Sequence, residues 1–396
     1  MSEWQTFYLK DLGKIVGGTT PSTNNPKNYG NKIAWITPKD LSTLQGRYIK
    51  KGSRSISRLG FKSCSCVLLP KHAILFSSRA PIGYVAIAKK RLCTNQGFKS
   101  IIPNKKIYFE FLYYLLKYHK DNISNIGGGT TFKEISGATL GLFKVKIPPT
   151  YYEQQKIART LSILDQKIEN NHKINELLHK ILELLYEQYF VRFDFLDENN
   201  KPYQTSGGKM KFSKELNRLI PSGWSVRFLN HKIVSTYQPK TISKTLLNDS
   251  YSYSVYGGGG IIGRFTEYNH EQSEFIISCR GQCGISYLTL PKSWITGNAM
   301  VIRPTKSYTS KTYLYHTIKK YKLTNYITGS VQPQITRQNL STIPILIPKR
   351  KTLNKWNNIS SLLWNLIHNN MQETQTLTAL RDFLLPLLLT QQVKPQ

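Results

Sequence analysis

The chain has 396 residues, of which 40% are apolar and 12% aromatic, a composition that suits two or three folded domains and excludes a disordered chain. Lysine and arginine number 55 against 22 aspartates and glutamates, so the formal net charge at pH 7 is +33. The five cysteines are an odd number without framework spacing, which excludes a disulfide-stapled secreted scaffold.

The N-terminus favours a protein of the cytoplasm. Its first ten residues, MSEWQTFYLK, lack the long apolar core of a signal peptide. No run in the sequence approaches the roughly 18 apolar residues that a membrane-spanning helix needs. We therefore expect a cytoplasmic protein without a membrane partner.

The positive charge is concentrated in two separate blocks. Residues 1–150 carry 24 basic and 6 acidic side chains, a net +18, and residues 211–350 carry 19 and 5, a net +14. The stretch between them, 151–210, carries 8 and 9. Two basic blocks favour two surfaces that bind a polyanion such as nucleic acid. The alternative is charge that serves only solubility.

The first block, residues 1–150, predicts an α+β domain with an irregular β-sheet. Its short apolar runs are typical of strands separated by glycine, proline and asparagine. The predicted strands are KIAWIT (32–37), AILFSS (73–78) and YVAIA (84–88), and the predicted helix is FEFLYYLLKYHK (109–120). The block ends on an alternating strand, 143–147, which Pro148 terminates because proline cannot donate a ladder hydrogen bond.

A heptad pattern follows in residues 151–193. Apolar residues recur in steps of four and three, which is typical of a long helix packed lengthwise on another helix. The polar members in its middle would fix the register of that pairing. The predicted seam is Ile157, Leu161, Leu164, Ile168, Asn171, Asn175, Leu178, Leu182 and Leu185.

A polar, turn-rich linker at 194–223 leads into a second α+β block at 224–350. The predicted strands of this block are EFIIS (274–278) and MVIRP (300–304), and its predicted helix is TYLYHTIKKYK (312–322). It also ends on an alternating strand, 343–347, before Pro348.

A second heptad pattern fills residues 351–390. A single helix of this kind would expose a long apolar face, so we expect the two long helices to pair as an antiparallel coiled coil that separates the two blocks. The antiparallel direction is expected because a whole block lies between the helices. The predicted seam is Ile359, Leu363, Leu366, Asn370, Glu373, Leu377, Leu380, Leu384 and Leu387.

The two halves repeat one another, which predicts an internal pseudo-twofold repeat. LFKVKIPP (142–149) is matched by TIPILIPK (342–349), GTTFKEI (129–135) by GSVQPQI (329–335), and WQTFYL (4–9) by WSVRFL (224–229). ILFSSRAPIG (74–83) resembles IISCRGQCG (276–284), so Arg79 matches Arg280. Residues 17–41 have no visible counterpart near 252–268, so we expect the interior of the blocks not to be repeated.

The sequence shows no catalytic motif. Gly258, Gly260 and Gly263 match a dinucleotide fingerprint by letter, but the residues before them do not predict a buried strand and those after them do not predict a helix. A flexible glycine loop is the preferred interpretation. The cysteines lack a histidine at zinc-finger spacing, and residues 51–100 contain no carboxylate that could hold a divalent ion. We expect no catalytic residue, no metal site and no cofactor on this chain.

The chain resembles the specificity subunit of Type I restriction–modification systems over essentially its whole length. The matching strings are LGKIVGGTTPS (12–22), WITPKDL (35–41), the segment 127–169 that contains IPPTYYEQQKIARTLSILDQKIE, and GSVQPQITRQNLSTIPILIP (329–348). The string from Ile147 to Ile168 is the most specific of these.

The resemblance implies two target recognition domains, each reading one half of a bipartite site in double-stranded DNA. It implies that the long helices hold these domains apart and bind methyltransferase (modification) subunits, and that a restriction (motor-nuclease) subunit joins the complex. S-adenosylmethionine, ATP and Mg²⁺ would be held by those partner subunits. This chain would carry specificity without catalysis.

Arginine, lysine, threonine and glutamine on the block loops are the side chains suited to phosphates and base edges. For the two matched arginines the alternative is a buried ion pair at a strand end, and the tyrosines of 251–259 either stack on bases or pack in the core. The candidate DNA contacts are Thr19, Thr20, Lys39, Arg79, Arg280, Gln332, Gln334 and Arg337.

Two other functions compete with sequence-specific recognition. One is a nucleic-acid-binding scaffold that ignores sequence, which would share the charge. The other is a coiled-coil assembly protein whose blocks bind protein partners, which the two basic blocks disfavour.

Overall fold

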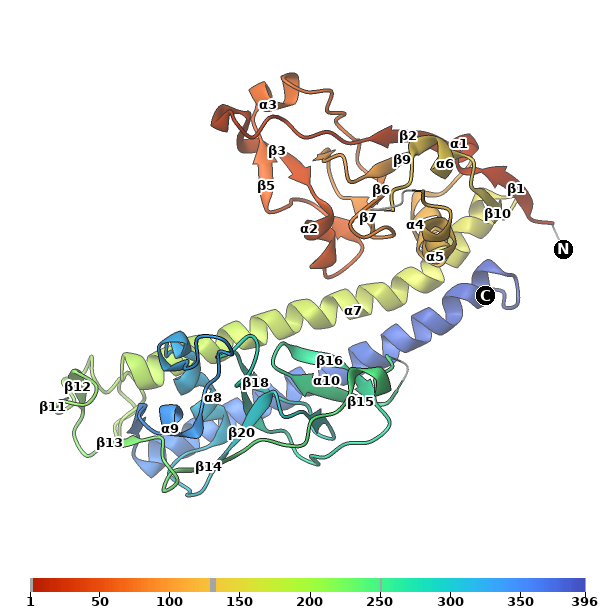
Figure 1. Cartoon of the computed structure of the whole chain (residues 1–396). Helices are drawn as coiled ribbons and strands as arrows, with labels where there is room; N and C mark the ends of the chain where they lie inside the picture. Colours follow the sequence, from red (N-terminus) through yellow and green to blue (C-terminus); the bar gives the residue numbers. More distant parts are fainter. Residues whose placement is uncertain (1–2, 129–132, 250, 396) are drawn as a thin grey trace. The chain divides into compact units, whose positions relative to one another are not determined.

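A computed structural model of the chain describes residues 3–128, 133–249 and 251–395 (Figure 1). Residue contacts divide the chain into two compact units. Unit 1 consists of Met1–Lys173 and Gln372–Gln396, and unit 2 of Ile174–Met371. Each unit therefore combines one basic block with one part of each long helix.

Unit 1 contains a five-stranded sheet in the order β2-β9-β6-β7-β4, a three-stranded sheet in the order β5-β3-β8, and the two-stranded ribbon β1-β10. Helix α4 packs on β6 and β7, and these elements share one buried core with the long helices. The strands are β1 (Gln5–Tyr8), β2 (Gly13–Gly17), β3 (Tyr29–Ile36), β4 (Tyr48–Ile49), β5 (Arg54–Ile56), β6 (Ile74–Phe76), β7 (Val85–Ala88), β8 (Cys93–Thr94), β9 (Lys99–Pro103) and β10 (Lys144–Ile147). The short helices are α1 (Leu9–Leu12), η1 (Pro26–Asn28), α2 (Pro38–Ser42), α3 (Arg58–Lys62), α4 (Phe109–Tyr118), α5 (Lys120–Asn125) and α6 (Gly137–Gly141).

Unit 2 contains a four-stranded sheet in the order β14-β20-β17-β18, a three-stranded sheet in the order β16-β15-β19, and the ribbons β13-β21 and β11-β12. Helix α8 packs on β17 and β18. The strands are β11 (Met210–Ser213), β12 (Arg218–Pro221), β13 (Ser225–Phe228), β14 (Val234–Tyr237), β15 (Tyr253–Gly257), β16 (Gly260–Phe265), β17 (Phe275–Ser278), β18 (Ser286–Leu288), β19 (Trp294–Ile295), β20 (Ala299–Pro304) and β21 (Pro344–Ile347). The short helices are η2 (Glu187–Val191), η3 (Lys244–Leu246), α8 (Lys311–Lys319), η4 (Leu323–Tyr326) and α9 (Arg337–Leu340).

The predicted α+β class is confirmed in both units. The five strands predicted inside the blocks correspond to β3, β6, β7, β17 and β20, and the two predicted block helices correspond to α4 and α8. The alternation expected in the last strand holds in β10, whose residues are alternately exposed and buried, but not in β21, where the last three residues are all buried.

The ribbon that frames each block is duplicated residue for residue. In unit 1 the first strand pairs Gln5 with Ile147, and in unit 2 the corresponding strand pairs Ser225 with Ile347. The offset between units is thus 220 residues on one strand and 200 on the other. Of the predicted match between 129–135 and 329–335, residues 129–132 lie outside the described part of the chain.

The expectation that the interior is not repeated is wrong for the strand topology. Strand β3 pairs antiparallel with β5 and parallel with β8, and β15 pairs antiparallel with β16 and parallel with β19. The same three-strand arrangement therefore occurs twice although the sequences differ. Backbone hydrogen bonds define a ladder and tolerate many side chains, so a repeated topology leaves little trace in residue letters.

The interpretation of residues 252–256 as unsuited to a buried strand is also wrong. Strand β15 is buried over its last four residues, where Tyr256 fills core space. The glycines at 258, 260 and 263 lie in the β15-β16 hairpin and its second strand rather than before a helix. The dinucleotide fingerprint therefore lacks its strand–turn–helix setting.

The two long helices are α7 (Tyr151–Tyr186, 36 residues) and α10 (Arg350–Leu389, 40 residues). At 1.5 Å per residue they are about 54 and 60 Å long. No helix in the described part of the chain has the length and apolarity required to span a membrane.

The helices pair antiparallel within unit 1. Arg381 Nη1 donates to Asp165 Oδ1 at 2.8 Å, and Asn171 Nδ2 donates to Glu373 Oε2 at 2.9 Å. Residue numbers rise along α7 as they fall along α10. The second pair brings two predicted polar members of the seam, Asn171 and Glu373, into contact.

The same direction holds within unit 2. Asn370 Nδ2 donates to Asn175 Oδ1 at 2.8 Å, and the rings of His179 and Trp364 meet edge to face with centroids 5.0 Å apart. The predicted antiparallel coiled coil is therefore confirmed in each unit, together with polar layers that specify its register.

The seam of α7 agrees with the predicted heptads, whereas the seam of α10 is partly shifted. All nine predicted α7 positions are buried or half-buried. On α10, Ile359, Leu366 and Leu380 are 37%, 44% and 43% exposed, while Ser360 and Ile367 are fully buried beside them. The true seam runs 356, 360, 363, 367, 370, 374, 377, 381, 384 and 388, so it includes Arg381, which the apolar pattern could not select.

In unit 1, a buried ionic cluster fastens the block to the helices. Arg47, only 3% exposed, donates to Glu110 of α4 at 3.1 Å and to Glu169 of α7 at 3.2 Å. Asp165 lies 4.0 Å from the same guanidinium and also accepts from Tyr114 Oη at 2.5 Å. Each charge has an opposite partner, which makes its burial tolerable.

In unit 2 the corresponding joint is aromatic. The ring of His316 on α8 stacks on Tyr186 with centroids 5.6 Å apart and meets Trp356 edge to face at 5.3 Å. Trp364 and His368 of α10 extend the cluster, with their ring centroids 5.8 Å apart. Both units therefore fasten the block to the long helices, unit 1 through ion pairs and unit 2 through aromatic rings.

Candidate DNA-binding surfaces

In unit 1, three loops meet at the turn that follows β8, and we call this set the first loop cluster: residues 18–20, 37–39, 77–79 and 94–99. Thr19 N–H donates to Thr94 O at 3.0 Å, and Ser78 N–H donates to Gly97 O at 2.8 Å. Asn95 N–H donates to the carbonyl of Ile36, which ends β3, at 3.0 Å. The turn thereby brings the predicted contacts Thr19, Thr20, Lys39 and Arg79 to one cluster.

Thr19 is a positioning residue of this cluster as well as a candidate contact. Its carbonyl accepts from Trp35 Nε1 at 3.0 Å, and its hydroxyl donates to Cys66 Sγ at 3.1 Å. A hydrogen bond from the Cys93 thiol is the main reason that the pKa of Cys66 falls to about 6. The Thr19 side chain thus faces the protein, and its backbone fixes the loop.

Thr20 and Lys39 are exposed. The Thr20 hydroxyl donates to the Gln96 side chain, which joins two loops of the cluster. Lys39 lies in the first turn of α2, where Asp40 accepts from the backbone N–H of Thr37 at 2.8 Å. Lys39 therefore extends from a fixed backbone toward solvent, as a phosphate contact requires.

Arg79 makes an ion pair, but not the buried one that was the alternative to a DNA contact. Its Nη1 lies 3.4 Å from Glu134 Oε2, and Lys99 Nζ lies 3.5 Å from Glu134 Oε1. The Arg79 side chain remains 38% exposed, so it is not sealed in the core. A phosphate at this place would compete with Glu134 for two cations.

In unit 2, a second loop cluster forms in the same way from residues 238–241, 257–260, 279–284, 296–298 and 332–337. Cys279 N–H donates to Asn298 O at 3.0 Å, as Ser78 N–H does to Gly97 O in unit 1. The backbone of Arg280 bridges that of Gln334, and both side chains are exposed.

The same kind of turn positions the matched arginine in each unit. Ser77 Oγ accepts from Tyr84 N–H at 2.8 Å, and Ser278 Oγ accepts from Ile285 N–H at 2.8 Å. Each turn ends on a glycine with positive φ: +100° at Gly83 and +89° at the equivalent position 284. A side chain is disfavoured there, since these glycines occupy left-handed backbone.

The two matched arginines differ in the charge of one neighbouring residue. Glu134 beside Arg79 is replaced by Gln334 beside Arg280, at an offset of 200 residues from the same small bridge. Arg280 is therefore bridged through its backbone to a residue with an uncharged amide, whereas Arg79 forms an ion pair with a carboxylate. This makes Arg280 the more available cation for a phosphate.

The remaining predicted contacts also lie on the second cluster. Gln332 is exposed in a tight turn closed by Gly329, where a Cβ would lie 2.5 Å from the Gln332 carbonyl oxygen. Arg337 is exposed at the start of α9. Of the neighbouring tyrosines, Tyr256 packs in the core and its hydroxyl accepts from Leu290 N–H at 3.0 Å.

Sequence reasoning missed the turns at the centre of each cluster. Asn95, Gln96 and Lys99 in unit 1 and Asn298 in unit 2 occupy these turns. The signal was present in the strings TNQG (94–97) and TGN (296–298), which follow β8 and β19. It was weak because only the threonine and the small polar composition are shared.

The charge of the chain suits a polyanion. Even if all 22 acidic side chains were paired one to one, 33 of the 55 lysines and arginines would lack an acidic partner. Within the residues that the structure describes, no three histidine, cysteine, aspartate or glutamate side chains gather as a metal site. The loops of the two clusters present cations and amides, which suit phosphates and base edges.

Comparison with known proteins identifies the family. The model of the Type I restriction modification DNA specificity domain matches residues 1–180 and 221–379, one copy for each half of the repeat. The chain belongs to the family of Type I restriction–modification specificity subunits. It is 32% identical to the MjaIX specificity subunit of Methanocaldococcus jannaschii, over 98% of this chain and 92% of that relative.

Two further comparisons agree with this specificity-subunit assignment. A putative MjaX specificity subunit from the same organism is 41% identical over 45% of this chain and 40% of the relative. The crystal structure of a Type I restriction–modification S subunit from M. genitalium has a TM-score of 0.61 at 18% identity, covering 97% of this chain and 96% of that one. The latter similarity supports the fold.

The coiled coil of this specificity-subunit family member exposes apolar side chains beside its seam. We call the exposed apolar side chains on the coiled coil of unit 2 the unit 2 stripe. The smaller set in unit 1 is the unit 1 stripe. Both follow heptad spacing on one flank of each helix. The unit 2 stripe is Ile174, Leu177, Ile181, Leu184, Ile359, Leu362 and Leu366, and the unit 1 stripe is Ile163, Leu380 and Phe383.

Proposed function

We propose that this chain reads a bipartite DNA target, one half with each loop cluster, as the specificity subunit of a Type I restriction–modification complex. The recognition domains would be residues 1–150 and 224–350, joined by the helices of 151–193 and 351–390 and the linker 194–223. The partner would be double-stranded DNA in the cytoplasm, as for the family.

The observation that carries this proposal is the duplicated frame with an exposed, cation-bearing loop cluster at the same place in each unit. Cys279 and Ser78 make equivalent backbone hydrogen bonds, and Arg79 and Arg280 follow them directly. A shared frame with different loop residues can present two different sets of base-reading side chains. That is the requirement for two unlike half-sites.

We infer that modification subunits bind the unit 1 and unit 2 stripes. Leu177, Leu184, Leu362 and Phe383 are 60%, 59%, 62% and 65% exposed, which is unusual for large apolar side chains on helices. At an offset of 199 residues, Ile163 matches Leu362 and Leu184 matches Phe383, so the repeat offers two related sites. Apolar heptad positions are suited to helices of a partner.

Catalysis is assigned to the partners in this proposal. The modification subunits would hold S-adenosylmethionine, and the restriction subunit would hold ATP and Mg²⁺. The role of the present chain is then to bind and orient DNA through its loop clusters and to hold the partners through its helices.

The test is binding of the chain, assembled with its modification subunits, to labelled duplexes of target and scrambled sequence. We expect tighter binding to the target duplex at each salt concentration. If six to ten phosphates are contacted, affinity should fall about 10³- to 10⁵-fold between roughly 50 and 200 mM salt.

Two outcomes would contradict the proposal. Equal affinity for target and scrambled duplexes would leave a scaffold that ignores sequence. A salt slope near zero would remove the DNA-binding function, because released counterions are the source of the slope.

A further inference from the structure

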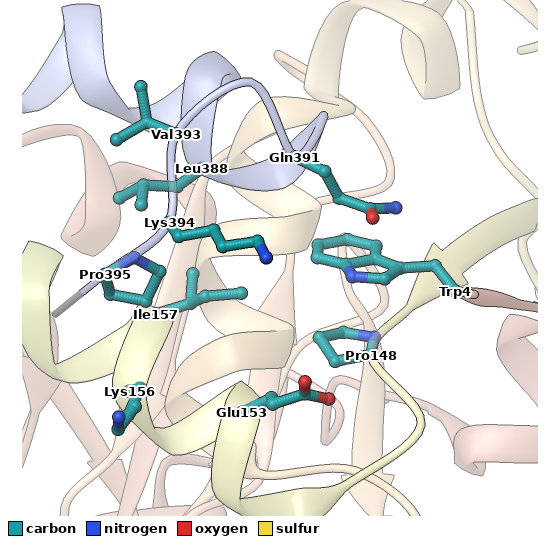
Figure 2. Close-up of a pocket in the computed structure, with 10 residues that line it drawn as sticks. All are labelled: Trp4, Pro148, Glu153, Lys156, Ile157, Leu388, Gln391, Val393, Lys394 and Pro395. Carbon is teal, nitrogen blue, oxygen red and sulfur yellow. The ribbon is translucent and has the colours of Figure 1, made fainter. Parts of the chain in front are cut away.

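A cavity of about 210 Å³ lies beside Trp4 in unit 1 (Figure 2). Its apolar wall is formed by Trp4 itself with Pro148 before α7, Ile157 of α7 and Leu388 of α10. Lys156 and Lys394 stand at its edge, and the Lys394 side chain points toward the Trp4 ring. An engineered apolar cavity of about 150 Å³ is large enough to bind benzene, so this one has room for an aromatic ring.

Unit 2 contains the same frame around Trp224, and there the space is filled. Trp224 precedes β13 as Trp4 precedes β1. The ring of Phe195 stacks on Trp224 with centroids 5.1 Å apart and planes 18° apart, and Tyr203 stacks on the other face of Phe195 at 4.9 Å. The rings of Phe190 and Phe193 also pack on Trp224, which is 1% exposed, whereas Trp4 is only half-buried.

The repeat shows which residue of unit 1 takes the place of Phe195. Ser360 and Leu161 occupy equivalent buried seam positions, which sets an offset of 199 residues between the helices. Beyond the helix ends the offset is 198 residues, because the residues with positive φ that follow the two helices are Phe193 (+58°) and Gln391 (+64°), and this places Val393 opposite Phe195. Neither Val393 nor Lys394, whose side chain points toward the Trp4 ring, is aromatic, so the slot beside Trp4 is left open.

The charges around the filled site at Trp224 indicate which peptide sequence would suit the open cavity beside Trp4. The segment that carries Phe195 also carries Asp194, Asp197 and Glu198, and lysines 349, 351 and 355 line the same site. Lys355 Nζ donates to the carbonyl of Leu196 at 3.3 Å. Lys156 is the unit 1 equivalent of Lys355, and it lines the open slot together with Lys394 and Glu153. Two lysines against one glutamate leave a net positive lining for a carbonyl or carboxylate.

We propose that the Trp4 cavity binds an aromatic side chain presented by an acidic peptide segment of a partner polypeptide. This binding site is separate from the proposed DNA-reading clusters and does not depend on them. A second copy of the chain is not suited to fill it, because its own Phe195 is 7% exposed and held between Tyr203 and Trp224.

The experiment uses the chain's own linker as the probe. A fluorescent peptide with the sequence of residues 193–204, FDFLDENNKPYQ, is titrated with the full chain and followed by anisotropy. We expect saturable binding that weakens about tenfold or more when the peptide carries Phe195→Ala, since the charges are unchanged and only the ring is lost. Equal binding of the two peptides would overturn the proposal.

Variants of the protein locate the site. Trp4→Ala should weaken peptide binding about tenfold, whereas Leu59→Ala, which removes a 50% exposed apolar side chain from the same unit, should leave it unchanged. Loss of binding in Leu59→Ala but not in Trp4→Ala would overturn the proposal.

Lys394→Phe keeps the test valid if Trp4→Ala does not fold. It places an aromatic ring beside Trp4, toward which the Lys394 side chain points, so it should raise the melting temperature by a few degrees and block the peptide. Unchanged peptide binding and melting temperature would contradict the assignment. The DNA affinity of the same variants should stay constant. The peptide-binding proposal can therefore fail or succeed independently of the DNA-binding proposal.

Discussion

Glu134 and Gln334 occupy one matched position of the repeated frame, and they give the two matched arginines different surroundings. Arg79 shares Glu134 with Lys99, whereas Arg280 lies beside an uncharged amide. The sequence repeat located both arginines and left open whether each meets DNA or an acidic partner. Side-chain pairing of this kind needs the fold, since residues 79 and 134 lie far apart in the chain.

Exchanging these two residues should change DNA affinity in opposite directions. Glu134→Gln removes the carboxylate that competes for Arg79 and Lys99, so we expect several-fold tighter DNA binding and a salt slope steeper by about one. Gln334→Glu should weaken binding and flatten the slope by a similar amount. Titration of the assembled complex at several salt concentrations measures both. If neither variant changes the slope, the clusters do not touch phosphates.

Removing Arg47 should destabilise unit 1. Its 3% exposed guanidinium is the cation that offsets Glu110 and Glu169, and a buried ion pair that loses one partner costs about 3–5 kcal/mol. We expect Arg47→Ala to lower the free energy of unfolding, measured in urea, by that amount. Lys39→Ala is the control, because an exposed lysine should change it by no more than about 0.5 kcal/mol. A loss below about 1 kcal/mol for Arg47→Ala would contradict the role of the cluster.

At the scale of elements, the helices show what a heptad pattern can and cannot predict. The pattern predicted both long helices and their pairing, because apolar periodicity reports the face that is buried. The pattern misplaced part of the α10 seam for two reasons. It assigned apolar residues of the exposed stripes, namely Ile359, Leu366 and Leu380, to the seam, and it left out Arg381. An arginine in a seam depends on a partner such as Asp165, which no periodicity reveals.

Seam and stripe leucines should respond differently to truncation. Leu182 is fully buried, so Leu182→Ala should cost about 2–5 kcal/mol of stability. Leu177 is 60% exposed, so Leu177→Ala should change stability by no more than about 0.5 kcal/mol while weakening binding of the modification subunit. Urea unfolding and calorimetric titration with that subunit measure the two effects. Unchanged partner binding in Leu177→Ala would count against the unit 2 stripe as a docking surface.

The aromatic joint of unit 2 should make this unit sensitive to acid. Burial lowers the pKa of His316 to about 3 and that of His368 to about 4, and neither Nε2 has a hydrogen-bond partner among the described residues. The unfolded chain takes up these protons near pH 6.5, so stability is complete above that pH and is lost as pH falls toward 4. The loss at pH 4 should be about 3 kcal/mol for each histidine.

Unfolding at pH 7.5 and pH 5 measures this dependence. His316→Phe keeps a ring in the cluster and removes the titrating group, so its stability should fall less between the two pH values. The same acid dependence in His316→Phe and in the unchanged chain would show that other groups are responsible.

At the scale of the whole chain, duplication is the organising feature. The frame ribbons repeat with identical register, and the interior sheets repeat in topology although their sequences differ. The sequence predicted the first of these because terminal prolines and alternating strands keep their letters. It missed the second because the residues of loops and interior strands are free to diverge as long as the backbone ladder is kept.

The most direct test of the central claim is sequencing of DNA methylation in the source organism with and without this gene. Two loop clusters on one chain predict that a single bipartite motif, with two half-sites at a fixed spacing, loses its methylation when the gene is removed. They also predict that changing side chains of the first cluster alone alters one half-site and leaves the other intact. Unchanged methylation after removal of the gene, or loss at a continuous motif, would contradict the account.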